Sequence, residues 1–182
     1  MAGRVTDPAP DPVGTAARFR SVMGRWATGV SVVTAHDPSG DAGLTVNALL
    51  SVALDPPSLL VSLQQGVDTL PVLRRSRSFG VSFLSAAQRE LSQRFARPVP
   101  SEEKFRGVAF HRGTSGVPLL DGALAALECR VVSESPAFDH VLVVGEVLRI
   151  EEGADGAPLL FYRGLYADPE GPDRLHLARR AP

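Results

Sequence analysis

Polar side chains are spread through an otherwise apolar segment between residues 43 and 69. We predict that this segment forms half-buried strands, so its hydroxyl and amide groups need hydrogen-bond partners. Two interpretations are open. Either the polar groups satisfy strand ends and helix caps, or they hold a planar heterocycle by its edge and leave one apolar face open. The side chains concerned are Thr45, Asn47, Ser51, Ser62, Gln64 and Thr69.

The common motifs of nucleotide-binding and hydrolytic enzymes do not occur in the sequence. No G-x-G-x-x-G follows a predicted strand, and neither G-x-x-x-x-G-K-[ST] nor H-E-x-x-H is found. The stretch GTSGV at 113–117 does not fit a G-x-S-x-G turn. The four histidines are widely scattered, so we expect no metal site; they are His36, His111, His140 and His176.

The charge balance makes two classes of partner improbable. Lysine and arginine together number 19 against 20 aspartates and glutamates, which gives a net charge of −1. Without excess positive charge there is no general attraction to a nucleic-acid backbone or an anionic membrane, and we expect neither partner. No apolar run is long enough to span a membrane, and the first residues lack the apolar part of a signal peptide.

The cysteine count and the length give a simple organisation. Cys129 is the single cysteine, so no internal disulfide can form, and we expect a cytoplasmic protein in which this thiol is a small core residue. A chain of 182 residues with 44% hydrophobic residues is typical of one globular domain. We predict a folded domain over 15–167, with a flexible Pro-rich tail at 1–14 and an Arg-rich tail at 168–182.

The residue patterns of this domain predict mostly strands. A helix capped by Thr15 is expected to continue to about Gly29, with Phe19, Met23 and Trp26 at helical spacing and Trp26 in a packing role. Branched and aromatic runs between turn residues predict strands at 30–36, 44–54, 58–63, 78–84, 108–112, 123–135, 140–152 and 158–166.

Two more helices and the order of the strands define the fold class. One helix is predicted from Asp68 or Thr69, and another follows a capping box formed by Ser85 and Gln88. Gly145, inside a long apolar strand, predicts a bend. Because strands follow strands at both ends of the domain, we predict a mostly β, closed or partly closed antiparallel barrel with a few short helices.

A family resemblance adds to these patterns. The sequence contains, in this order, the blocks FRSVMGRWATGVSVVTA, GLTVNALLSVALDPPSLLVSL, FGVSFL, LSQRFA, KFRGVAF, GVPLLDGALAALECRVV, DHVLVVGEV and PLLFYRGLY. These blocks cover about residues 18–167 and resemble the short-chain flavin reductase family, whose fold is an FMN-binding split β-barrel.

The resemblance implies a function and partners. It implies a homodimeric enzyme that transfers hydride from NADH or NADPH to FMN or FAD and supplies the reduced flavin to a separate monooxygenase. Two alternatives remain: a flavin-binding electron carrier without enzymatic activity, and an interaction module that has kept the fold without a cofactor.

The resemblance also implies where flavin would bind. The candidates are Thr45, Val46, Asn47 and Ala48 on one strand, Ser62, Leu63 and Gln64 on another, Thr69 and Arg94 near the ribityl phosphate, and Ser51 and Ser82. A guanidinium and a helix start both suit a phosphate. The alternative for Arg94 is a solvated helix charge, and the alternative for Ser51 is a hydroxyl that closes an edge of the sheet.

Asp139 and His140 match the family's Asp-His pair. The resemblance implies that His140 orients the reduced nicotinamide while Asp139 or a backbone carbonyl fixes the tautomer of His140. Three positions depart from the family pattern: Phe138 replaces a common glycine, Ser82 a frequent asparagine, and Val67 a small hydroxyl residue. We expect Phe138 either to narrow the nicotinamide entrance or to stack on a ring.

Overall fold

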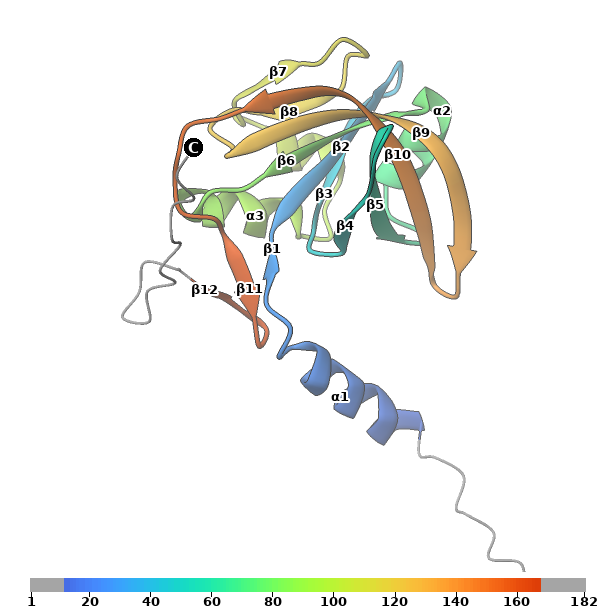
Figure 1. Cartoon of the computed structure of the whole chain (residues 1–182), viewed down its shortest axis with the longest axis vertical. Helices are drawn as coiled ribbons and strands as arrows, with labels where there is room; N and C mark the ends of the chain where they lie inside the picture. Colours follow the sequence, from blue (N-terminus) through green and yellow to red (C-terminus); the bar gives the residue numbers. More distant parts are fainter. Residues whose placement is uncertain (1–11, 168–182) are drawn as a thin grey trace, which may run out of the picture.

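An antiparallel seven-stranded sheet dominates the computed structural model, which describes residues 12–167 (Figure 1). In sheet order the strands are β3 (Gly40–Val46), β2 (Ser31–Asp37), β6 (Ser78–Phe83), β9 (Ala125–Ala137), β10 (His140–Glu152), β5 (Pro57–Gln64) and β4 (Leu49–Leu54). The two edge strands, β3 and β4, are joined only by Asn47 and Ala48. The two edges of the sheet must therefore meet at this end, which curls the sheet into a barrel and confirms the predicted mostly β barrel fold.

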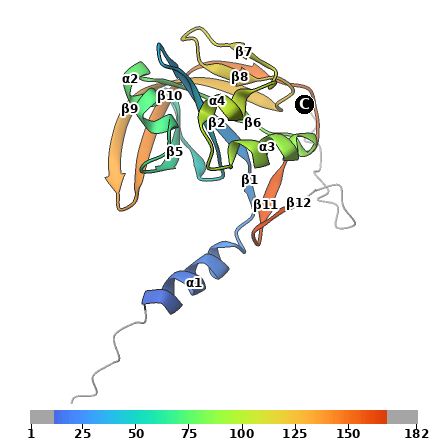
Figure 2. The same cartoon turned by 180° about the vertical axis from the view of Figure 1, so that it is seen from behind.

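Short helices and two small sheets surround the barrel. Helix α2 (Thr69–Ser76) packs on β2, while α3 (Arg89–Phe95) and α4 (Ser101–Phe105) pack on β3 (Figure 2). The remaining elements are the 3-10 turn η1 (Ala86–Gln88), the pair β7 (Phe110–Arg112) and β8 (Pro118–Leu120), and a sheet of β1 (Thr28–Gly29), β11 (Leu160–Tyr162) and β12 (Leu165–Ala167). Among residues 12–167, no helix has the length and apolar character needed to cross a bilayer.

Two hydrophobic clusters lie on opposite sides of β2, because successive strand residues face opposite ways. Val33 belongs to the cluster that also holds Leu63 and Phe79, whereas Val32 belongs to the cluster that holds Phe95 and Phe105. The rings of Phe95 and Phe105 meet edge to face with centroids 4.9 Å apart. This contact holds α3 to α4 and so fixes the loop between them near the end of β3.

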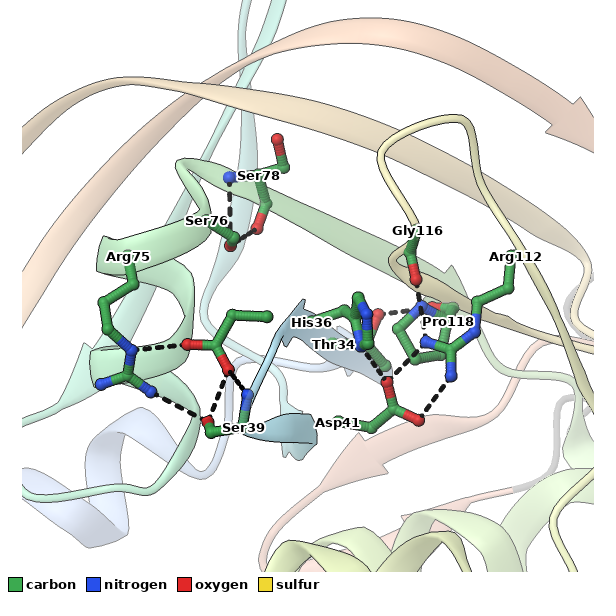
Figure 3. Close-up of polar contacts among 11 residues, drawn as sticks. Thr34, His36, Ser39, Asp41, Arg75, Ser76, Ser78, Arg112, Gly116 and Pro118 are labelled. Atoms are coloured by element: carbon green, nitrogen blue, oxygen red, sulfur yellow. Dashed lines mark hydrogen bonds and ion pairs between the residues drawn. The ribbon is translucent and has the colours of Figure 1, made fainter.

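The β2–β3 turn is tied to α2 through a buried carboxylate. Asp37 accepts hydrogen bonds from the Ser39 hydroxyl at 2.5 Å, from the Ser39 backbone N–H at 2.8 Å and from Arg75 Nε at 2.5 Å; Figure 3 shows Ser39 and Arg75. The Ser39 hydroxyl, and next the Arg75 guanidinium, lower the pKa of Asp37 to about 2. On the other side of the turn, Asp41 accepts hydrogen bonds from Arg112 and lies 2.8 Å from His36 Nδ1 (Figure 3). These contacts hold α2 and the β7–β8 turn against one hairpin.

The first helix differs from the prediction. Helix α1 (Pro12–Met23) begins three residues before Thr15 and ends at Met23, while Thr28 and Gly29 form β1. It projects away from the barrel (Figure 1), and Trp26, which lies after it, is 71% exposed rather than packed. Helical spacing of apolar residues predicts an apolar face but not its partner, and the described part of the chain does not cover this face.

The predicted tails lie almost wholly outside the described residues. Residues 1–11 and 168–182 are not described, and residues 12–14 of the predicted N-terminal tail belong to α1. The proline at position 12 suits the first position of a helix because the first N–H groups have no partner within the helix. The helix therefore starts earlier than the composition of the segment predicts.

Other local predictions hold, except that two of the predicted strands are each divided by a turn. The capping box is confirmed, because the Ser85 N–H donates to Gln88 Oε1 at 3.1 Å and the pair introduces η1 and α3. The β9–β10 pairing shifts between Val144 and Gly145, at the position where Gly145 predicts a bend. The single strand predicted over 44–54 is wrong, because Asn47 and Ala48 turn the chain from β3 into β4. The single strand predicted over 158–166 is also wrong, because Arg163 and Gly164 turn the chain from β11 into β12.

Candidate functional site

A cavity of about 720 Å³ lies between the end of β3, the end of β5 and the loop that joins α3 to α4. Residues 44–48 form one wall, Ser62, Gln64 and residues 66–68 form another, and residues 95–100 with Lys104 form a third. His140, the first residue of β10, completes the lining. A cavity of this size is in the range that accepts a cofactor or another small molecule.

The barrel topology brings seven of the predicted site residues to this cavity. β5 is the common neighbour, because the Ser62 N–H donates to the Ala48 carbonyl at 3.0 Å and Gln64 pairs with His140. Residues far apart in the sequence therefore share one wall. The seven are Thr45, Val46, Asn47, Ala48, Ser62, Gln64 and His140.

Both interpretations of the polar segment describe part of this site. The Thr45 hydroxyl donates to the Ser92 carbonyl at 2.6 Å, so it ties β3 to α3 and satisfies backbone. Asn47 and Gln64, in contrast, are exposed at the cavity. Their amide groups can both donate and accept hydrogen bonds, which suits the polar edge of a heterocycle.

Three of the predicted flavin-binding side chains are buried and do not line the cavity. Leu63 is in the barrel core, and Thr69 is buried at the first position of α2. The hydroxyl of Ser82 accepts a hydrogen bond from the Leu120 N–H at 3.0 Å, which joins β6 to β8. Each of these side chains has a structural position in the fold and lies outside the cavity lining.

Two more predicted residues lie at the surface away from the lining. Ser51 is exposed on the edge strand β4, next to a shift in its pairing with β5. Arg94 donates from Nη1 to the Arg106 carbonyl at 2.9 Å. The structure does not bring either side chain into the cavity wall, and their roles in flavin binding stay predictions.

Asp139 and His140 form a hydrogen-bonded pair at the rim. The His140 Nδ1 lies 2.9 Å from the Asp139 Oδ1, and the side chains are 41% and 77% exposed. The hydrogen bond from His140 lowers the pKa of Asp139, so this carboxylate is ionised and accepts the bond. Nδ1 therefore carries a proton, and Nε2 of a neutral His140 is left as a hydrogen-bond acceptor.

Lys104 is a cavity residue to which the sequence patterns assign no role. Only 8% of it is exposed, and its Nζ donates to the Gly43 carbonyl at 3.2 Å. Burial lowers the pKa of Lys104, and the charge of Asp68 partly opposes this effect. Asp68, which also lines the cavity, compensates this buried charge only in part, so a negatively charged group bound beside Lys104 would stabilise it further.

Arg97 is the second cation that the patterns do not identify. It lines the cavity from the α3–α4 loop and is exposed. Lys104 is the only lysine among the 19 basic residues, a signal that draws attention to it without assigning a role. The cavity thus combines amide side chains, two cations and a histidine at the rim. Such a set suits a planar heterocycle that carries a phosphate.

No cluster of three histidine, cysteine, aspartate or glutamate side chains is arranged for a metal ion within residues 12–167. Cys129 is fully buried in the core, and burial raises its pKa to about 12. This thiol therefore stays protonated and lies outside the cavity lining.

Comparisons with known proteins find relatives that align with most of this chain. The chain is 40% identical over 148 residues to the FMN reductase (NADH) SmoA of Agrobacterium fabrum. The aligned region covers 81% of this chain and 83% of that protein. It is 39% identical over 150 residues to the reductase component of the 4-nitrophenol 4-monooxygenase/4-nitrocatechol 2-monooxygenase of Rhodococcus opacus, covering 82% and 79%.

A solved structure supports the same relationship. The NADH:FAD oxidoreductase SgcE6 of Streptomyces globisporus superimposes with a TM-score of 0.80 at 33% identity, covering 88% of this chain and 98% of that one. Residues 23–170 match the family model described as the flavin reductase like domain. The chain therefore belongs to the flavin reductase family, and it is a flavin oxidoreductase with a mostly β barrel fold.

Proposed function

We propose that this protein uses NADH to reduce FMN or FAD in the cavity between β3 and β5, and that it supplies the reduced flavin to a separate monooxygenase. The observation that carries the proposal is the buried Lys104 ammonium beside exposed amide side chains in a cavity of about 720 Å³. A flavin nucleotide matches both features, since it has a heterocycle with a polar edge and a phosphate. When bound, the flavin accepts hydride from the reduced nicotinamide.

The residues of this chain have distinct tasks in the proposal. Lys104 and Arg97 hold the phosphate, with Lys104 supplying the charge that is shielded from water. Asn47 and Gln64 hydrogen-bond the polar edge of the ring. His140 positions the nicotinamide through Nε2, because its Nδ1 is occupied by Asp139. Hydride transfer needs two rings held in contact, so positioning rather than proton transfer is the contribution of His140.

A separate monooxygenase is proposed as the consumer of the product. The Rhodococcus opacus relative is by name the reductase component of a monooxygenase. Four residues of the cavity lining are exposed to solvent, so the reduced flavin can leave there: Asn47, Ala48, Gln64 and Gly66. A flavin that must reach another protein has to dissociate, and affinity differences among related sites lie mainly in dissociation rates.

Homodimer formation is also part of the proposal. Leu50, Val52 and Leu54 alternate along the edge strand β4 and are 52%, 50% and 88% exposed. An exposed apolar edge strand is a site for association. Sedimentation velocity on the wild type is expected to give a dimer, and Leu54→Glu is expected to shift it toward monomer. A monomeric wild type would contradict dimer formation.

The cytoplasm is the proposed compartment of this protein.

The activity is tested by mixing the purified protein with NADH or NADPH and with FMN or FAD in all four combinations. Loss of nicotinamide absorbance above the spontaneous rate is expected, with NADH preferred. Tight flavin retention through gel filtration without turnover would instead show an electron carrier. Absence of flavin binding in equilibrium dialysis would show a cofactor-free interaction module.

A further inference from the structure

The turn between β9 and β10 holds an aromatic residue in a backbone conformation that favours glycine. The last pair of the hairpin is Ala137 and His140, so Phe138 and Asp139 form a two-residue turn. Phe138 has a φ of 57°. At the first central position of such turns a positive φ is usually supplied by glycine, because a side chain there is strained.

The Phe138 side chain is also fully exposed, at 101% of its reference area. It therefore gains no burial against residues 12–167 that would offset the cost of its backbone conformation. The contacts among these residues do not account for a phenylalanine at this position. A contact outside residues 12–167 is the remaining source of stabilisation.

The turn has a fixed position at the rim of the cavity. Gln65 donates from its backbone N–H to the Asp139 carbonyl at 2.8 Å and from Nε2 to the Phe138 carbonyl at 3.0 Å. The neighbours of Gln65 in the sequence, Gln64 and Gly66, line the cavity, as does His140. A ring with few rotatable bonds is therefore held close to the place where the nicotinamide enters in the proposed function.

The chemistry of the turn favours a heterocycle over a phosphate as the contacting group. The Asp139 carboxylate is 77% exposed beside Phe138 and repels phosphates. A phenyl ring has a face on which an aromatic ring stacks. We infer that Phe138 binds a heterocyclic ring of the reduced pyridine nucleotide, and so sets the affinity for the nucleotide without changing the affinity for flavin; this inference rests on the proposed function.

The test compares Phe138→Gly, Phe138→Leu and Phe138→Tyr with the wild type at saturating flavin. Phe138→Gly is expected to raise the KM for NADH and the inhibition constant of NAD⁺ by roughly 3- to 10-fold, the range that corresponds to one aromatic stacking contact. Tyr is expected to keep the wild-type values and Leu to fall between. The dissociation constant of flavin, measured by fluorescence titration, is expected to stay the same.

Arg163→Gly is the matched control. Arg163 also has a positive φ, 51°, in the two-residue turn between β11 and β12, and it does not line the cavity. Both glycine variants relieve backbone strain, so both are expected to unfold at the wild-type temperature or above it. Only Phe138→Gly is expected to change the nucleotide constants.

Three results would overturn the inference. An unchanged KM for NADH and an unchanged NAD⁺ inhibition constant in Phe138→Gly would show that the ring does not contact the nucleotide. A change in sedimentation of Phe138→Gly would place the ring in a subunit contact instead. A wild type that reduces no flavin would overturn the proposed function and this inference with it, whereas the first two results leave the proposed function intact.

Discussion

Lys104 on α4 donates a hydrogen bond from Nζ to the Gly43 carbonyl on β3, 3.2 Å away and 61 residues earlier in the chain. Gly43 permits this approach, because a Cβ at that position would lie 2.9 Å from the Phe95 ring. The helices α3 and α4 therefore pack close enough to β3 to place the single lysine of the chain in the cavity.

Replacing Lys104 by methionine is expected to weaken FMN binding by about 10- to 100-fold, the equivalent of one charge-assisted contact of about 1.5–3 kcal/mol. Riboflavin, which lacks the phosphate, is expected to bind the variant and the wild type equally. Fluorescence titrations with both ligands measure this difference. Without flavin the change in stability is expected to be small, because removal of the costly buried charge is offset by loss of the hydrogen bond to the Gly43 carbonyl.

Arg97→Ala and Arg94→Ala are the companions of this experiment. Arg97 lines the cavity and is exposed, so we expect a smaller loss of FMN affinity than for Lys104→Met. Arg94 is bonded to the Arg106 carbonyl instead, so with the phosphate at Lys104 the affinity of Arg94→Ala is expected to stay close to wild type, whereas the role implied by the family resemblance predicts a loss. A larger effect of Arg94→Ala than of Lys104→Met would contradict the assignment of the phosphate to Lys104.

Replacing His140 by alanine is expected to lower kcat/KM for NADH roughly tenfold, the loss of about one hydrogen bond that positions the nicotinamide. The flavin dissociation constant is expected to change by less than about twofold. Steady-state kinetics and flavin titration measure the two quantities. Asp139→Asn keeps an acceptor for Nδ1 and is expected to retain more activity than His140→Ala; an equal loss in both would show that the charge of Asp139 matters in its own right.

His111 is expected to make the stability of the fold depend on pH. Its Nδ1 lies 2.8 Å from Asp121 Oδ1 and its Nε2 lies 2.7 Å from Glu151 Oε2, which joins β7 to β10. Two carboxylates can only accept, so both ring nitrogens carry protons in this arrangement. The hydrogen bond to Asp121 is the main cause of the raised pKa of His111.

The sign of this effect follows from the direction of the shift. A folded-state pKa above the unfolded value means that the stabilisation is complete below the unfolded pKa of about 6.5 and is lost as the pH rises through the folded pKa. The Tm of the wild type is therefore expected to fall more than that of His111→Gln between about pH 6 and about pH 9. Parallel curves for the two proteins would contradict this role.

Gly145→Ala is expected to destabilise the barrel by about 1–3 kcal/mol through overpacking. A Cβ at Gly145 would lie 2.4 Å from Phe79 Cζ, in the fully buried core of the barrel. Urea unfolding measures the loss. Phe79→Leu in the same chain removes the ring, so the double variant is expected to be more stable than the sum of the two single changes predicts. If the two losses of stability simply add, the methyl group added at position 145 does not clash with the Phe79 ring.

The sequence by itself determined the local structure and one side of the cavity. The apolar run between turn residues at 58–63 predicts the strand whose Leu59, Val61 and Leu63 are buried, and the capping box predicts the helix start at Ser85. These patterns are reliable because they depend on backbone geometry and on neighbours close in sequence. The family resemblance adds Thr45–Ala48, Ser62, Gln64 and His140, which the structure places around one cavity.

Only the tertiary structure decided which cations face that cavity and which apolar faces stay uncovered. Arg94 and Arg97 are three residues apart, yet only Arg97 lines the wall, because α3 ends at Phe95 and the chain turns there. Lys104 reaches Gly43 only because Phe95 and Phe105 pack on β2 and β3. The helical periodicity of the sequence identifies the apolar residues of α1. The direction in which this helix leaves the barrel depends on contacts between distant segments, and no local pattern contains that information.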